Sequence, residues 1–183
     1  MMEKLKRNWI FAAAAFAIAA AVHLASVHAI PDLVMMRVLS VAAQRTGFNT
    51  MVHTARATAR SRFVVRPSPD LFYSSCAYDL STTPNHALRV HASAMPDTYW
   101  SVSAFDARTN NFFVMNDRQA RSGSVDIVII APGAYVGAAK VPVIVSPTLR
   151  GLVLFRTLIN SETRLAEIDA GRRRAACEPF AAD

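Results

Sequence analysis

The hydrophobic pattern sets the start of the chain apart from the rest. Residues 9–27 carry no formal charge and are rich in Ala, Ile, Val and Phe. About 20 residues at ~1.5 Å rise each span the hydrocarbon core of a bilayer, so this run predicts a transmembrane helix. The basic residues that precede it, Lys4, Lys6 and Arg7, predict that the N-terminus stays in the cytoplasm and that the remainder is exported.

A cleaved signal peptide is the competing interpretation of the same run. Val27-His28-Ala29 fits a small-x-small cleavage pattern, which places the mature start at Ile30. The run is longer than the usual signal-peptide core, and an apolar helical face continues past Pro31 through Met36 and Leu39, which favours retention. Both interpretations export the domain, and retention predicts a single-pass inner-membrane protein with its domain in the periplasm.

His23 lies inside the predicted span, where an ionisable side chain is a candidate functional group. The span contains no acidic residue that could complete a proton relay with it. Contact with a partner helix in the membrane is therefore its expected role.

Beyond Arg62 the pattern changes to short runs of β-branched and aromatic residues separated by Pro, Gly, Asn and Asp. Such spacing without intervening helices predicts a mainly β fold, either an antiparallel β-sandwich or an open-barrel-like domain. The predicted strands are Phe63–Arg66, Leu71–Leu80, Ala87–His91, Thr98–Phe105, Asn111–Met115, Val125–Ile130, Val141–Val145 and Gly151–Ile159.

Alternation along the fourth of these strands separates its two faces. Trp100, Val102 and Ala104 form a core face, and the opposite face, with Ser101 and Ser103, is amphipathic and could line a groove.

A short C-terminal helix is expected after the last strand. Ser161 is its predicted N-cap, Glu162 lies in its first turn, and Arg172–Arg174 lie near its end, as the helix dipole prefers. Gly171 is a possible break before the arginines.

These elements predict four segments. They are a cytoplasmic basic flank (1–7), a transmembrane anchor (8–29), a helical or irregular connector (30–61) and an exported β domain with a C-terminal helix and tail (62–183).

Two cysteines, Cys76 and Cys177, both fall in the exported part. An oxidising compartment permits their pairing, and two cysteines allow one intramolecular connectivity. A disulfide that fastens the C-terminal tail to the domain is favoured, and two separate buried thiols are the alternative.

Charge and motifs limit the chemistry. The formal net charge of +7 favours anionic lipid or glycan surfaces, but the basic residues lack interleaved aromatics, which argues against nucleic acid. The sequence has no GxSxG, HExxH, P-loop or GxGxxG signature, and its histidines are not spaced to share a metal, so neither a cofactor nor a metal is expected.

One set of polar residues near predicted turns remains as a candidate pocket for a carboxylate or a sugar. The alternative is that these residues only make turns and ion pairs. The set is Arg66, Asp70, Tyr73, Asp106, Arg108 and Asn110.

Several short motifs together resemble the domain of unknown function family 1254 (DUF1254). They are residues 66–75 (RPSPDLFYSS), 79–80 (DL), 99–106 (YWSVSAFD), 109–112 (TNNF), 146–148 (SPT) and 156–158 (RTL). The resemblance covers roughly residues 62–159 and implies a β-sandwich-like fold in an envelope or secreted setting, with no assigned reaction and no catalytic residues.

Longer relatives join this domain to a related one, family 1214. The present chain resembles a short, membrane-anchored form, which implies a companion protein of the 1214 type. Its cysteines depart from the long-form pattern, which fits a disulfide particular to the short form.

The predicted function is a non-enzymatic, membrane-anchored envelope module for binding or assembly. The alternative is a periplasmic hydrolase or other small-molecule enzyme that uses the polar Arg/Asp/Tyr pocket. A transport accessory protein is a third possibility.

Overall fold

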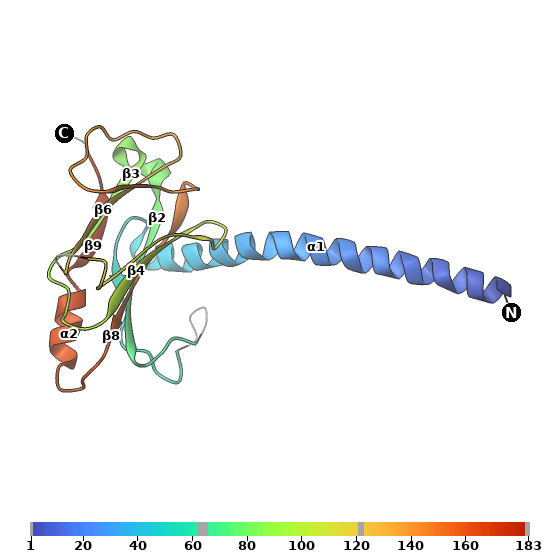
Figure 1. The fold of residues 1–183 in the computed structure, drawn as a ribbon, viewed down its shortest axis with the longest axis horizontal. Helices are drawn as coiled ribbons and strands as arrows, with labels where there is room; N and C mark the ends of the chain where they lie inside the picture. Colours follow the sequence, from blue (N-terminus) through green and yellow to red (C-terminus); the bar gives the residue numbers. More distant parts are fainter. Residues whose placement is uncertain (1, 62–65, 121–122, 182–183) are drawn as a thin grey trace.

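The computed structural model describes residues 2–61, 66–120 and 123–181, and its longest element is a single N-terminal helix. This helix, α1 (Met2–Thr46), has 45 residues and includes Pro31 without interruption. Its N-terminal part extends away from the rest of the molecule (Figure 1). Large apolar side chains from Trp9 to Met36 are exposed on it. By length and composition the helix could cross a membrane, and a signal sequence would have the same properties.

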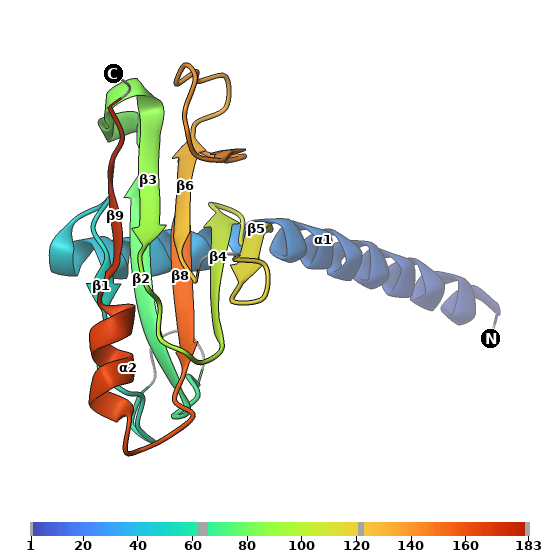
Figure 2. The same cartoon turned by 60° about the vertical axis from the view of Figure 1, so that its left-hand side comes forward.

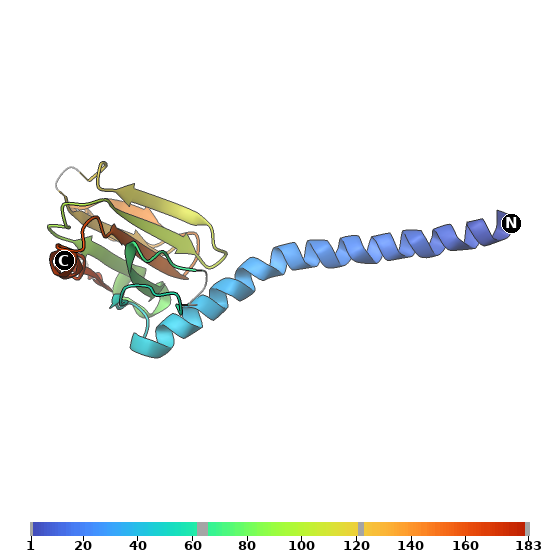
Figure 3. The ribbon, with the colours of Figure 1, turned by 90° about the horizontal axis from the view of Figure 1, so that it is seen from below.

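The C-terminal end of α1 is packed against the β domain. Met35 and Leu39 are buried against Ala77, and Phe105 and Leu152 complete the contact. Figure 3 shows α1 running beside the sheets before it leaves the domain. The same helix is therefore exposed and apolar at one end and part of a folded core at the other.

The β domain consists of two sheets. The five-stranded sheet has the order β1 (Val52–His53), β2 (Leu71–Asp79), β8 (Arg150–Leu158), β4 (Trp100–Asp106) and β5 (Asn111–Asn116). The four-stranded sheet has the order β7 (Val143–Val145), β6 (Val125–Ile130), β3 (Ala87–Ala92) and β9 (Ala175–Pro179). All neighbouring strands are antiparallel except β6 and β7. The mainly β class with an N-terminal and a short C-terminal helix is confirmed.

The core lies between the sheets, because its buried residues come from strands of both; Figure 2 shows the strands of one sheet in front of those of the other. Alternate residues of β4, including Trp100 and Val102, face it together with Ile127 and Ile129 of β6. Cys76 of β2 and Cys177 of β9 form a disulfide within this core, with their Cα atoms 6.6 Å apart. The predicted disulfide is thus present, and it joins the two sheets.

Seven of the predicted strands correspond to β2–β8, and the eighth, Phe63–Arg66, lies largely outside the described residues. Two short strands were not predicted. β1 lies inside the segment expected as a connector, and β9 lies in the expected tail. Two 3-10 turns, η1 (Leu80–Thr82) and η2 (Pro84–His86), connect β2 to β3.

The start of the C-terminal helix was predicted wrongly. Helix α2 spans Leu165–Arg172, and Arg164, not Ser161, occupies the N-cap position. The Ser161 hydroxyl pairs instead with the Thr163 hydroxyl at 2.7 Å. Gly171 does not break the helix, which continues to Arg172. A Cβ at this position would collide with Pro96, so glycine permits close packing there.

Arg172 has a structural role that its position at a helix end did not reveal. Its guanidinium is buried and donates to Asp169 at 2.6 Å and to the carbonyls of Tyr73 and Thr54 at 2.8 and 2.7 Å. It also lies over the ring of Phe72, 4.3 Å from the centroid. Arg172 therefore fixes α2 to the edge of the five-stranded sheet.

Candidate functional site

The six predicted pocket residues divide between opposite ends of the five-stranded sheet. Tyr73 pairs with Arg156 in the ladder of β2 and β8, whereas Asp106 of β4 pairs with Gly151 of β8. Four residues of β8 therefore lie between the two paired positions, and the single pocket predicted from the sequence does not assemble.

Three of the six residues belong to the β4–β5 hairpin. The buried Asp106 carboxylate accepts from the backbone N–H of Arg108 at 2.8 Å and of Asn110 at 2.9 Å, and from the Asn110 side chain at 2.9 Å. The Arg108 guanidinium donates to Asp32 of α1 at 3.1 Å. This group closes a turn and braces it against α1, as the structural alternative for these residues proposed.

The other three residues lie where β2 begins. The Tyr73 hydroxyl accepts from the backbone N–H of Ser68 at 3.0 Å. Asp70 is exposed, and its carbonyl accepts from the backbone N–H of Ile159 at 2.8 Å. Arg66 is exposed. These contacts shape the corner that leads into β2.

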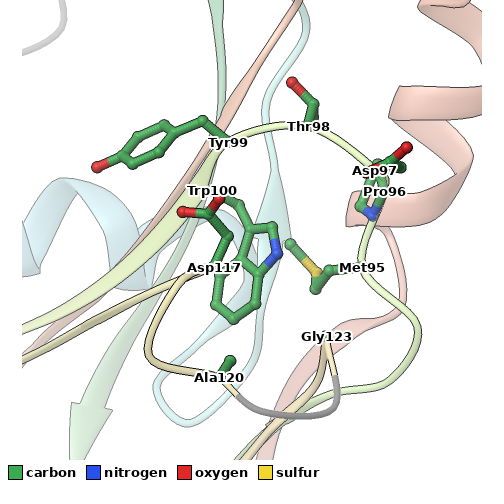
Figure 4. A pocket seen from close by; sticks show the side chains of 9 residues that line it. All are labelled: Met95, Pro96, Asp97, Thr98, Tyr99, Trp100, Asp117, Ala120 and Gly123. Atoms are coloured by element: carbon green, nitrogen blue, oxygen red, sulfur yellow. The ribbon is translucent and has the colours of Figure 1, made fainter.

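A different pocket, of about 460 Å³, opens at the other end of the β4–β5 hairpin. One wall is the segment that leads into β4, and the other is the turn that follows β5 (Figure 4). The pocket is lined by Met95, Pro96, Asp97, Thr98, Tyr99, Trp100, Asp117, Ala120 and Gly123.

Local hydrogen bonds hold the two walls together. The backbone N–H of Met95 donates to the carbonyl of Gly123 at 3.0 Å, and the backbone N–H of Asp117 donates to the carbonyl of Trp100 at 3.1 Å. The side chain of Asn116 accepts from two N–H groups of the turn that follows it. These hydrogen bonds fix the positions of the segments that line the pocket.

Asp117 is the notable group in this pocket. One of its carboxylate oxygens, Oδ1, is buried and has no hydrogen-bond partner among the described residues. Figure 4 shows the carboxylate beside the ring of Trp100, which is almost completely buried, while Tyr99 is 43% exposed. Enclosing a carboxylate oxygen without a hydrogen-bond donor destabilises the folded state. A ligand that supplied the donor would remove this penalty.

The combination of a carboxylate with aromatic side chains suits ligands that present hydroxyl or ammonium groups. A carboxylate only accepts hydrogen bonds, and aromatic faces attract cations and the apolar faces of sugar rings. Within the described part of the chain, no group of three or more His, Cys, Asp or Glu side chains could hold a metal ion.

The sequence contained a partial signal for this site. Asp117 lies two residues beyond a predicted strand, Asn111–Met115, and Tyr99 and Trp100 lie near the start of the neighbouring one, Thr98–Phe105. Antiparallel pairing brings the end of β5 beside the start of β4. The sequence did not reveal the path of the segment before β4 and of the turn after β5, and the pocket lies between these two segments.

The fold and the pocket define a helix-bearing, two-sheet β domain with a polar, aromatic-lined site. The chain belongs to the DUF1254 family, described as a protein of unknown function, whose model matches residues 48–179. The match includes all pocket residues and begins where α1 has ended.

The comparison with solved structures gives two matches, of which the first shows a similar fold. The VPA0106 protein from Vibrio parahaemolyticus aligns with a TM-score of 0.62 and 11% identity, over 82% of this chain and 35% of that protein. An uncharacterized protein from Burkholderia cenocepacia aligns with a TM-score of 0.47 and 15% identity, over 81% of this chain and 41% of that protein. The present chain thus spans about a third of the length of the Vibrio protein. The comparison with curated proteins finds no match.

Proposed function

We propose that this protein is a single-pass envelope module that holds a ligand-binding β domain on the periplasmic face of the inner membrane. The observation that carries the proposal is that α1 has one part that is apolar and exposed and another that is packed in the β domain. Its large apolar side chains between Trp9 and Val27 have no covering layer within the described structure, whereas Met35 and Leu39 are buried in the domain. Such an exposed apolar helix is explained by a bilayer around it.

The contact between α1 and the β4–β5 hairpin supports a defined orientation. The predicted span ends at residue 29, and Asp32 lies just beyond it, paired with Arg108 at the hairpin turn. This turn then lies near the membrane surface. Because the pocket is at the opposite end of the same two strands, it opens away from the bilayer.

We propose that the pocket binds an envelope glycan or another ligand with hydroxyl or ammonium groups, held by Asp117 and the aromatic side chains. Binding to anionic lipid through the basic surface, contact of His23 with a partner helix, and a companion of the 1214 type are further parts of the proposal. The hydrolase alternative depended on a polar Arg/Asp/Tyr cluster, whose members Tyr73 and Asp106 occupy two separate ends of the sheet. Binding rather than turnover is therefore favoured.

Anchoring is tested by N-terminal sequencing of the protein recovered from the membrane fraction. We expect the start of α1 to be intact and the β domain to be digested by protease added to spheroplasts. A mature start at Ile30 would show that the helix is removed, and protection from the protease would contradict export.

Ligand binding is tested by saturation-transfer NMR, with a neutral disaccharide and tetramethylammonium as probes. We expect at least one probe to bind, and Asp117→Asn to weaken it by about tenfold or more, since hydrogen bonds to a charged group contribute about 1.5–3 kcal/mol. Asp70→Asn removes an equally charged but exposed carboxylate outside the pocket, and it should leave binding unchanged. Equal binding by all three proteins would contradict the assignment of the pocket.

A further inference from the structure

A second cluster of unsatisfied polar groups lies on the outer face of the five-stranded sheet, the face against which α1 packs. Ser101 and Ser103 of β4 are each only 1% exposed, and neither hydroxyl has a hydrogen-bond partner among the described residues. The Nε atom of Arg156, in β8, is enclosed and unpartnered in the same way. These three residues are called the Arg156 cluster below.

The ladder brings the three side chains together. Ser101 lies directly opposite Arg156 in the pairing of β4 with β8. Ser103 is two positions further along β4, so its side chain points to the same face. Phe105 and Leu152 continue that face to the end of α1, which packs on them. The cluster is therefore part of the rigid sheet and adjoins the docked end of the helix.

The cluster has more donors than acceptors and no negative charge. A guanidinium has five N–H donors and no acceptor, and each hydroxyl can donate one hydrogen bond as well as accept. No described carboxylate forms an ion pair with Arg156. The neighbouring positions on this face carry no acid either: they are Tyr73, Ser75, Leu154, Leu158, Val114 and Asn116.

The segment that leads into β2 carries a net positive charge. It connects β1 to β2, covers residues 54–70, and has four arginines and one acidic residue, Asp70. An enclosed Nε–H without an acceptor is unfavourable, and one acceptor-rich anion would satisfy both it and the two hydroxyls. Arg156 as a residue keeps part of its surface accessible, which leaves a direction of approach.

We infer that the Arg156 cluster is an anion-binding site for a phosphate or carboxylate group, separate from the Asp117 pocket. The two sites have opposite charge, since one is centred on a carboxylate and the other on a guanidinium. They also lie on opposite faces of β4, because Trp100 points into the core side and Ser101 to the helix side.

The test measures thermal unfolding of the full chain in nonionic detergent with increasing inorganic phosphate, at constant ionic strength set with chloride. We expect a saturable rise in Tm for the wild type, and Arg156→Gln to weaken the apparent phosphate affinity at least tenfold. Arg118→Gln is the matched control, because Arg118 is exposed in the turn after β5. An equal phosphate response of the wild type and Arg156→Gln would overturn the inference.

The double variant Ser101→Ala/Ser103→Ala keeps the test decisive if Arg156→Gln fails to fold. We expect it to unfold at a higher temperature than the wild type without phosphate, because two unpartnered hydroxyls are removed, and to lose most of the phosphate response. An undiminished response would overturn the inference.

Nanodiscs distinguish the two sources of the anion. A phosphate response that is lost in phosphatidylglycerol discs but kept in phosphatidylcholine discs supports an anionic lipid headgroup as the occupant. An equal response in both supports a soluble phosphate or carboxylate.

Discussion

Buried carboxylates have two different roles in this protein. Asp79 accepts from the backbone and hydroxyl of Ser81 and from Arg150, whose Nε lies 2.7 Å from Oδ2. Burial raises the pKa of Asp79, but these hydrogen bonds outweigh it and hold the pKa below its ordinary value. Asp106 likewise serves the backbone of its own turn, whereas Asp117 keeps an oxygen without a donor. Only the last of these is free to serve a ligand.

The role of Asp106 gives a prediction. Asp106→Ala removes three hydrogen bonds and leaves two backbone N–H groups of the hairpin without their acceptor. We expect the free energy of unfolding to fall by about 2–3 kcal/mol, measured by urea denaturation in detergent. Asp70→Ala, which removes an exposed carboxylate, should change the stability by less than about 0.5 kcal/mol. Equal effects of the two substitutions would contradict the structural role of Asp106.

At the scale of elements, the docking of α1 depends on a few apolar contacts. Met35 is 5% exposed, and its neighbour Met36 is 58% exposed, so the two residues form a matched pair on one helix. Met35 packs in the cluster that joins the helix to β2 and β8. These apolar contacts hold the helix end in place, and the backbone N–H of Asn49, just after the helix, also donates to the carbonyl of Ala77 in β2 at 2.8 Å.

This pair gives a second prediction. Met35→Ala should lower stability by about 2–3 kcal/mol and speed hydrogen exchange in the docked end of α1, because it leaves a cavity under the helix. Met36→Ala should change both measurements little. Faster exchange in both variants, or in neither, would show that the helix end is not held by this contact.

The elements that were predictable from the sequence are those with an alternating or uniform apolar pattern. The strands from Leu71 to Leu158 have such patterns, and so does α1. β9 has the sequence Ala-Ala-Cys-Glu-Pro, without β-branched or aromatic residues, and it exists because it pairs with β3 and is joined to β2 by the disulfide. Its formation depends on distant contacts, which no local pattern reports.

The candidate sites show the same limit. Polar residues near turns could be recognised, but which of them share a pocket depends on the strand order, in which β8 separates β2 from β4. Ser101 and Ser103 were expected on an amphipathic face that could line a groove, yet both are buried. Burial of that face arises from other parts of the chain, so alternation within β4 could not report it.

At the scale of the whole molecule, the disulfide joins sites far apart along the chain. Cys76 and Cys177 are 101 positions apart, and their bond connects the two sheets. In the chain-entropy model, closing a loop of ~100 residues stabilises the folded state by up to about 4–5 kcal/mol.

Replacing both cysteines by alanine should therefore lower the free energy of unfolding by about 2–5 kcal/mol, measured by guanidinium denaturation. Reducing agent should destabilise the wild type similarly and leave the double variant unaffected. A wild-type stability that does not respond to reduction, with free thiols shown by labelling, would contradict a stabilising role for the bond.

The continuity of α1 has a mechanical consequence. At ~1.5 Å per residue a helix of 45 residues is about 68 Å long, more than twice the ~30 Å thickness of a hydrocarbon core. In the proposed arrangement, no flexible hinge separates the membrane-embedded part from the docked part. A tilt or rotation of the membrane-embedded part of α1 then turns the β domain through the same angle. The orientation of the pocket relative to the bilayer is therefore coupled to the tilt of the helix.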